Sequence, residues 1–131
     1  MIKNVVMMAM ALLFVAATAP AASPTGEGPT VTEVFVFDVG PNLPKFMDLS
    51  QRADAIAKKY GGTVKARTWM ATYSGPNTGN VIVTVEYPSF MSLAQSRAKI
   101  NASPEWQKLV ADAQASIKLV SNSIVEEIKA P

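Results

Sequence analysis

Arg67, Trp69 and Tyr73 are the side chains of this sequence that are best suited to hold a small molecule. They alternate along a β-rich run, Thr63 to Tyr73, so we expect them to point to one face of a strand. In a pocket, Trp69 would stack on a planar ligand, Arg67 would bind an anion or carbonyl, and Tyr73 would donate a hydrogen bond. Aromatic residues and Arg are also enriched in subunit interfaces, and a dimer interface is the interpretation that we favour.

Phe37 and Glu86, on two neighbouring predicted strands, complete the set of candidate ligand-binding residues. Glu86 also forms a candidate pair with Asp38, since two carboxylates at neighbouring strand ends can divide acid and base roles in proton abstraction. The alternative is that both carboxylates are solvated, or paired with Arg67 or Arg97. We favour this alternative because no sequence pattern indicates that either carboxylate is desolvated.

The chain contains no Cys and no His. This composition excludes disulfides, thiol nucleophiles, Ser-His-Asp triads, haem ligation by His or Cys, and zinc sites of the usual kinds. Met47, Met70 and Met91 are too dispersed for a copper site and are typical of core residues. We therefore expect neither a metal nor another cofactor.

The charge pattern argues against a polyanionic partner. The net charge is +2, and the basic residues are scattered along the chain and not clustered. Nucleic acids and acidic membrane surfaces are recognised by basic patches, so neither is expected as a partner.

The first 21 residues are predicted to be a signal peptide. Lys3 precedes an unbroken apolar run, Val5 to Ala17, and Ala19-Pro20-Ala21 supplies the small residues of a cleavage site. The run is shorter than the ~20 residues of a membrane-spanning helix, although an uncleaved anchor is the alternative. We expect a periplasmic or secreted protein without a stable membrane anchor after cleavage, with a flexible leader over residues 22–29 and one domain over 30–129.

Periodicity predicts a β-α-β-β-α-β order in that domain, which is the split βαβ arrangement of ferredoxin-like folds. Gly61-Gly62 ends the first helix, Pro88 ends the third strand, and Ser103-Pro104 restarts a broken second helix. The predicted strands cover residues 30–39, 63–73, 81–87 and 119–128, and the predicted helices cover residues 43–60, 89–101 and 104–117.

The first predicted strand is apolar on both of its faces. Phe35 and Phe37 alternate with Val34 and Val36, whereas a strand with one buried face should alternate with polar residues. Helices would cover one face of the sheet. A second copy of the chain would cover the other, in a symmetric homodimer.

Two short motifs resemble a known family. Val83 to Phe90 reads VTVEYPSF, and Asn101 to Gln107 reads NASPEWQ. On these motifs the chain, from Thr30 to Ile128, resembles the dimeric α/β-barrel superfamily and is most similar to NIPSNAP-like and antibiotic-biosynthesis-monooxygenase-like domains. The resemblance implies an α+β, ferredoxin-like fold with an antiparallel sheet and helices on one face. Superfamily members include cofactor-free monooxygenases, isomerases, haem enzymes and ligand-sensing domains, so the fold does not settle the activity.

Three functional hypotheses follow. The first is an exported homodimer of unassigned activity that binds a small apolar or aromatic molecule between sheet and helices. The second is a cofactor-independent monooxygenase or isomerase that acts on an aromatic or quinone-like substrate, with Arg67, Trp69 and Tyr73 in the pocket. The third is a structural dimerisation module, which predicts no cavity larger than a few methyl groups.

Overall fold

The computed structural model describes residues 29–61 and 65–131. The predicted signal peptide and nearly all of the leader lie outside these residues. Within the described ranges, no helix has the length and hydrophobicity of a membrane-spanning segment. The elements follow the predicted order: β1 (Val31–Asp38), α2 (Leu43–Ile56), β2 (Lys65–Met70), β3 (Val81–Tyr87), α3 (Phe90–Asn101), α4 (Pro104–Gln114) and β4 (Lys118–Glu126).

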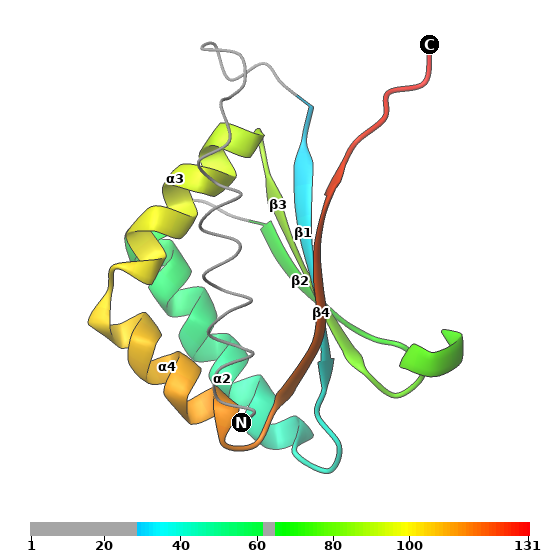
Figure 1. The fold of residues 1–131 in the computed structure, drawn as a ribbon, viewed down its shortest axis with the longest axis vertical. Helices are drawn as coiled ribbons and strands as arrows, with labels where there is room; N and C mark the ends of the chain where they lie inside the picture. The colour runs from blue at the N-terminus through cyan, green and yellow to red at the C-terminus, as the bar shows by residue number, and fades with distance from the viewer. Residues whose placement is uncertain (1–28, 62–64) are drawn as a thin grey trace.

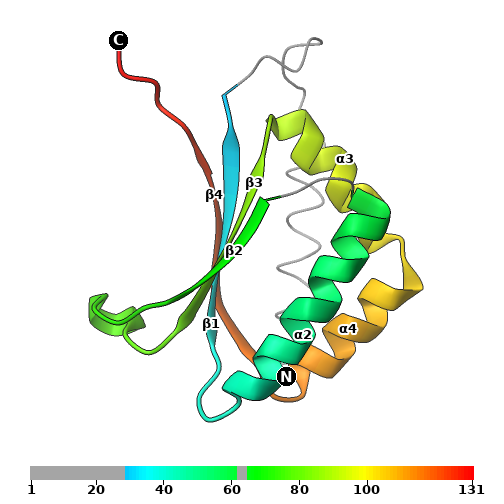
Figure 2. The same cartoon turned by 180° about the vertical axis from the view of Figure 1, so that it is seen from behind.

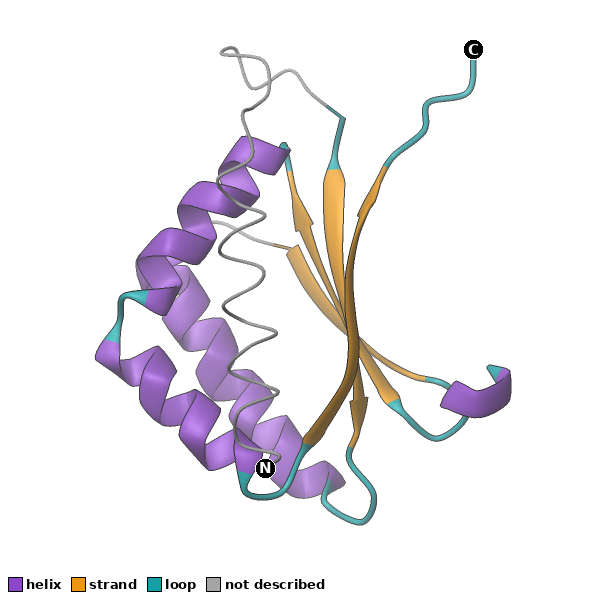
Figure 3. Cartoon of the chain, viewed as in Figure 1, coloured by secondary structure: helices purple, strands orange, loops and turns teal. Residues whose placement is uncertain are grey.

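The four strands form one antiparallel sheet in the order β2-β3-β1-β4. Helices α2, α3 and α4 all lie on one side of it, as Figures 1, 2 and 3 show. Strands β1 and β3 are central, and their register pairs Phe35 with Val83. The register between β1 and β4 shifts between Val36 and Phe37, where the ladder is irregular. The predicted α+β, ferredoxin-like architecture is confirmed.

The core lies between the sheet and the helices. Alternation along β1 sends Val31 and Phe35 to this side, where burial of apolar surface stabilises the fold. The larger cluster of buried residues joins both layers, and it consists of Val39, Phe46, Leu49, Ile56, Val81, Ile100, Leu109 and Ile117.

The opposite side of the sheet carries no α-helix among the described residues, and only the short 3₁₀ turn Gly75–Asn77, at the tip of the β2–β3 hairpin, projects on that side (Figure 2). We call it the open face and define it by Val34, Val36, Trp69, Ile82 and Thr84, which the strand registers place side by side. It is apolar at its centre, because Val36 and Ile82 are paired there, and Val36 is only 7% exposed.

Serine side chains fix the starts of the two C-terminal helices. The Ser89 side chain accepts a hydrogen bond from the Ser92 backbone N–H at 3.1 Å, and Ser103 accepts one from Trp106 at 3.2 Å. Each bond satisfies a backbone donor that the first helical turn leaves free. Pro104, at the first position of α4, has no N–H to satisfy. The predicted restart of the helix at Ser103 is confirmed.

Several predicted boundaries were wrong: α4 ends at Gln114 and not at residue 117, and β4 ends at Glu126 and not at residue 128. Helix α2 ends at Ile56 and continues as a π-helical turn, Ala57–Gly61, instead of running as α-helix to Tyr60. Strand β2 ends at Met70 and not at Tyr73. The hairpin closes at Ala71, whose backbone N–H donates to Asn80 at 2.9 Å, and the chain then leaves the ladder.

Candidate functional site

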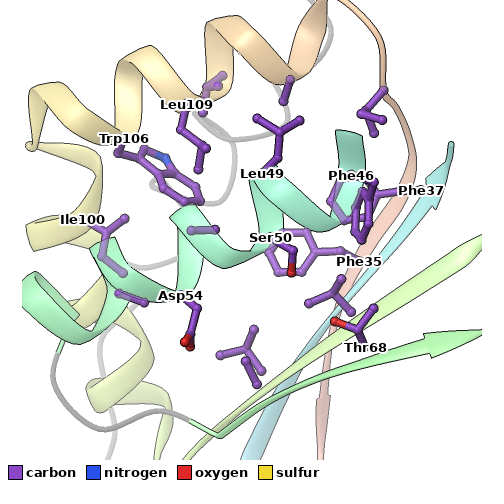
Figure 4. A pocket seen from close by; sticks show the side chains of 18 of the residues that line it. Phe35, Phe37, Phe46, Leu49, Ser50, Asp54, Thr68, Ile100, Trp106 and Leu109 are labelled. Atoms are coloured by element: carbon purple, nitrogen blue, oxygen red, sulfur yellow. The ribbon is translucent and has the colours of Figure 1, made fainter. Parts of the chain in front are cut away.

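A cavity of about 410 Å³ lies between the sheet and the helices. Its wall on the sheet side comes from all four strands, and its other wall from α2, α3 and α4, as Figure 4 shows for the labelled side chains. Most of the lining is aliphatic or aromatic: Phe35, Phe37, Phe46, Leu49, Ala53, Ala57, Val83, Val85, Ile100, Trp106, Leu109, Val110, Ala113, Ile117 and Leu119.

Three phenylalanines form an aromatic corner of this cavity. The rings of Phe35 and Phe37 are stacked with centroids 6.0 Å apart, and Phe37 meets Phe46 at 5.3 Å with a 53° tilt. Both are distances at which aromatic pairs attract beyond their area burial. Phe37 is thus the candidate ligand-binding residue that the structure places in the cavity.

The cavity opens beside the edge strand β2. Ala66 and Thr68 line it, yet every residue of β2 is exposed to solvent. Across from them, α2 contributes Ser50 and Asp54 (Figure 4). The entrance therefore has a polar rim, and the interior behind it is apolar.

A buried ion pair lies at the end of the cavity near α3. Glu33 of β1 is fully buried, and Arg97 of α3 is 6% exposed. The Arg97 Nε donates to Glu33 Oε2 at 2.9 Å, its Nη2 donates to the same oxygen, and Asn122 Nδ2 donates to Oε1 at 3.1 Å. The Arg97 guanidinium also lies 5.0 Å from the centroid of the Phe35 ring. Glu33 is therefore paired and hydrogen-bonded through both oxygens, as a buried charge must be.

Tyr87 is the second polar group at this end of the cavity. Burial raises the pKa of its phenol above the ordinary value of 10.0, while the charge of Arg97 and a hydrogen bond with Ser96 oppose that shift. Desolvation disfavours the phenolate, so the group is protonated at neutral pH and can donate a hydrogen bond.

The ring carbons of Trp106 line the cavity. Its Nε1 atom is buried and has no hydrogen-bond partner among the described residues. Solvent does not reach this atom, so it faces packed side chains and not the open volume. Figure 4 shows the indole extending from α4 toward the cavity.

Arg67, Trp69 and Glu86 lie outside the cavity. The register pairs Arg67 and Trp69 with Thr84 and Ile82 on the open face, and Trp69 Nε1 donates to Thr84 Oγ1 at 3.1 Å. On the same face, Glu86 lies 3.5 Å from Lys65 Nζ. These three residues therefore share a surface with one another but not with Phe37.

Tyr73 does not share that surface. It follows the end of β2 and is 99% exposed. The prediction that it projects from the strand beside Trp69 was wrong, because the hairpin closes before the chain reaches it.

The candidate carboxylate pair of Asp38 and Glu86, the less favoured interpretation of the sequence, is not formed. Glu86 is opposite Thr32, whereas Asp38 ends β1 at the other end of the antiparallel ladder. At about 3.4 Å per residue, the two carboxylates are roughly 20 Å apart. Asp38 instead accepts a hydrogen bond from the Gly40 backbone N–H at 3.2 Å.

The pair that does form, Glu33 with Arg97, was missed from the sequence. The signal was present: Glu33 interrupts an apolar side of the first strand, and Arg97 falls on the apolar face of its helix. Two opposite charges at core positions indicate a buried pair.

The fold and the cavity define the class of protein as a ferredoxin-like α+β domain. Solved structures with this fold include a NIPSNAP family protein of unknown function from Agrobacterium tumefaciens. It is 15% identical, with 76% of this chain and 88% of that chain covered and a TM-score of 0.60. A NIPSNAP-like domain protein from Burkholderia xenovorans is 23% identical over 78% of this chain and 89% of that one, with a TM-score of 0.59.

A second NIPSNAP family protein from Agrobacterium tumefaciens is 16% identical over 84% of this chain and 92% of that one, with a TM-score of 0.61. No protein-family model and no curated protein matches the sequence. The chain therefore has the NIPSNAP-like form of the ferredoxin-like fold, as the resemblance predicted. Identities at this level show the fold and not an activity.

Proposed function

We propose that this protein is an exported homodimer that binds a small apolar or aromatic molecule in the cavity between its sheet and its helices. The observation that carries the proposal is the cavity itself. A volume of about 410 Å³ falls in the ~300–1,000 Å³ range of small-molecule sites, and an apolar lining with few polar groups is typical of such sites.

The homodimer is supported by the open face. Trp69 lies there beside Ile82 and is 50% exposed, and no α-helix covers the two side chains among the described residues. A symmetric partner would bury the same face of both copies. Export is supported by the signal-peptide pattern of residues 1–21.

The two alternatives have less support. A purely structural module predicts no sizeable cavity, and one of about 410 Å³ is present. The oxygenase or isomerase hypothesis relied on Arg67, Trp69 and Tyr73, none of which lines the cavity.

Binding in the cavity can be located with the two tryptophans of the chain, because they lie on opposite sides of the sheet. Trp69→Phe keeps only Trp106, in the cavity wall, and Trp106→Phe keeps only Trp69, on the open face. Menadione, a planar and uncharged quinone, is a suitable probe because it quenches indole fluorescence. We expect saturable quenching of the variant that keeps Trp106, with much weaker quenching of the variant that keeps Trp69.

A thermal melt of the unsubstituted protein with menadione is the second readout. Ligand at one hundred times its Kd stabilises the folded state by about 2.7 kcal/mol, so Tm should rise. Saturable quenching of Trp69 alone would place the ligand on the open face and overturn the proposed site. Absence of both quenching and a Tm shift for menadione, naphthalene and biphenyl would overturn ligand binding as the function.

A further inference from the structure

The cavity has a polar end, and that end restricts the chemistry of its ligand. Arg97 and Tyr87 both line the cavity although each is at least nine-tenths buried. They come from different elements, α3 and β3. The strand register places Tyr87 one inward-facing position along β3 from Val85, which lies opposite Glu33, the partner of Arg97. The remaining lining offers mainly carbon atoms, apart from Gln114 at the end of α4 and the rim beside β2.

The charge of Arg97 is already compensated. Its Nε and Nη2 both donate to Oε2 of Glu33, which is fully buried on β1. An anionic ligand at this end would bring a second negative charge next to Glu33 in a region of low dielectric, where like charges repel strongly. The ion pair thus disfavours carboxylates and phosphates in spite of the arginine.

Arg97 and Tyr87 can still donate hydrogen bonds to an uncharged acceptor on a ligand. A guanidinium carries five N–H donors, more than one carboxylate oxygen can accept, and a protonated phenol carries one O–H. An oxygen without charge can accept from such groups without meeting the repulsion that an anion meets. A pure hydrocarbon at the same place would leave these donors facing carbon, which is unfavourable for buried polar groups.

We propose that the ligand is uncharged and carries an accepting oxygen, such as a ketone or quinone carbonyl, which binds against Arg97 and Tyr87 while its apolar body fills the cavity. This inference rests on the proposed function and specifies the ligand class of the same site.

Three probes of nearly equal shape test whether the ligand is uncharged and carries an accepting oxygen. 2-Acetylnaphthalene carries a carbonyl, 2-isopropylnaphthalene replaces the carbonyl by a methine bearing a methyl group, and 2-naphthoate carries a negative charge. Equilibrium dialysis at pH 7 should give a Kd about tenfold lower for the ketone than for the hydrocarbon, the effect of one net hydrogen bond. The naphthoate should bind more weakly than the ketone.

Tyr87→Phe removes one hydroxyl and preserves the ring. We expect it to reduce the preference for the ketone and to leave the Kd of 2-isopropylnaphthalene unchanged. Trp69→Phe, on the other side of the sheet, is the matched aromatic control and should change none of the three constants.

The outcomes separate this inference from the function on which it rests. Equal binding of ketone and hydrocarbon, or tightest binding of naphthoate, would overturn the ligand class and leave cavity binding intact. Loss of hydrocarbon and ketone affinity by the same factor in Tyr87→Phe would overturn the role of the hydroxyl. If none of the three probes binds, both the ligand class and the proposed function fail.

Discussion

Glu33 and Arg97 form an ion pair in the interior of this molecule, next to the cavity. Both side chains are removed from solvent, and Glu33 is also held by Asn122. Desolvating two charges is expensive, and their attraction offsets this only when both are present and well hydrogen-bonded. The pair therefore matters less for its net stabilisation than for the penalty of breaking it.

Arg97→Met should destabilise the fold by about 3–5 kcal/mol, because it leaves the Glu33 carboxylate buried without its partner. The double variant Glu33→Gln with Arg97→Met removes both charges and should recover much of that loss. Urea unfolding of the single and the double variant measures the difference. A double variant that is less stable than the single one would contradict this account of the pair.

The residue scale is also where the sequence was least informative. Alternation correctly grouped Arg67 with Trp69, but it does not say which side of an edge strand faces the helices. In β2 the small residues Ala66 and Thr68 face the cavity, and Lys65, Arg67 and Trp69 face away. The outer side carries Lys65 and Arg67 together with Trp69. Its charges indicate a solvent-facing side and its tryptophan a buried one, so residue types alone do not mark the inner side.

Helix α4 depends on its first turn. Ser103 accepts from the Trp106 backbone N–H, and its hydroxyl donates to the carbonyl of Ile100 at 2.8 Å. The serine thus ties the start of α4 to the end of α3. It also fixes the position of Trp106, which forms part of the cavity wall.

Ser103→Ala should lower the free energy of unfolding by about 1 kcal/mol, the usual effect of losing a capping serine. The matched control is Ser74→Ala, since Ser74 precedes the short 3₁₀ turn Gly75–Asn77 and makes no side-chain capping hydrogen bond there. Denaturant titration should show a shift for Ser103→Ala alone. Equal shifts for both variants would show that the cap is not the cause.

An ion pair connects α2 to α4 across the helical layer. Arg52 Nη2 lies 2.8 Å from Asp112 Oδ2. The hydrogen bond from Arg52 holds the pKa of Asp112 below its ordinary value of 3.8, and partial desolvation opposes the shift. A carboxyl whose pKa is lowered on folding stabilises the protein above its unfolded pKa, and this contribution is lost as the pH falls through the folded value.

Arg52→Gln should therefore reduce the loss of Tm that occurs as the pH falls from about 5 to below 3, while the variant is already less stable at neutral pH. Lys129→Gln, at the exposed C-terminal end, removes the same charge and is the control. Parallel profiles of Tm against pH for the unsubstituted protein and Arg52→Gln would show that the pair contributes nothing to acid sensitivity.

At the scale of elements, hydrophobic periodicity and the Gly, Pro and Ser residues that begin or end helices and strands predicted most of the structure. β3 was predicted at its observed limits, Val81–Tyr87, because turn residues precede it and Pro88 follows it. The errors lie where local signals are weak. The π-helical turn after α2 has the same apolar stripe as an α-helix, and β2 ends where hydrogen bonds of the hairpin, and not residue types, close the ladder.

At the scale of the whole molecule, the sheet has one side covered by helices and one side without an α-helix among the described residues (Figure 2). The β-α-β-β-α-β order predicted helices on one side only. The two-sided hydrophobicity of β1 predicted that a second copy of the chain covers the other side, which stays a prediction. The sequence could not indicate the cavity, since its volume depends on how far the helices stand from the sheet. That distance results from the packing of many residues together.

The homodimer proposal gives a direct prediction. Trp69→Lys places a charge on the open face and should raise the dissociation constant of the dimer by about 30-fold or more, the effect of losing a central aromatic contact. Tyr73→Lys, at an exposed position beyond the end of β2, is the control. Light scattering over a concentration series measures both. A dimer that Trp69→Lys leaves intact, or an unsubstituted protein that stays monomeric, would contradict the proposed interface.

The exposure of β2 has a consequence for engineering. Ala66 and Thr68 belong to the cavity wall but not to the buried core, so their replacement disturbs little packing. Exposed substitutions of this kind usually change stability by less than about 0.5 kcal/mol. Substitutions at Ala66 or Thr68 can thus change the size of molecule that the cavity accepts, while the stability of the fold stays nearly the same.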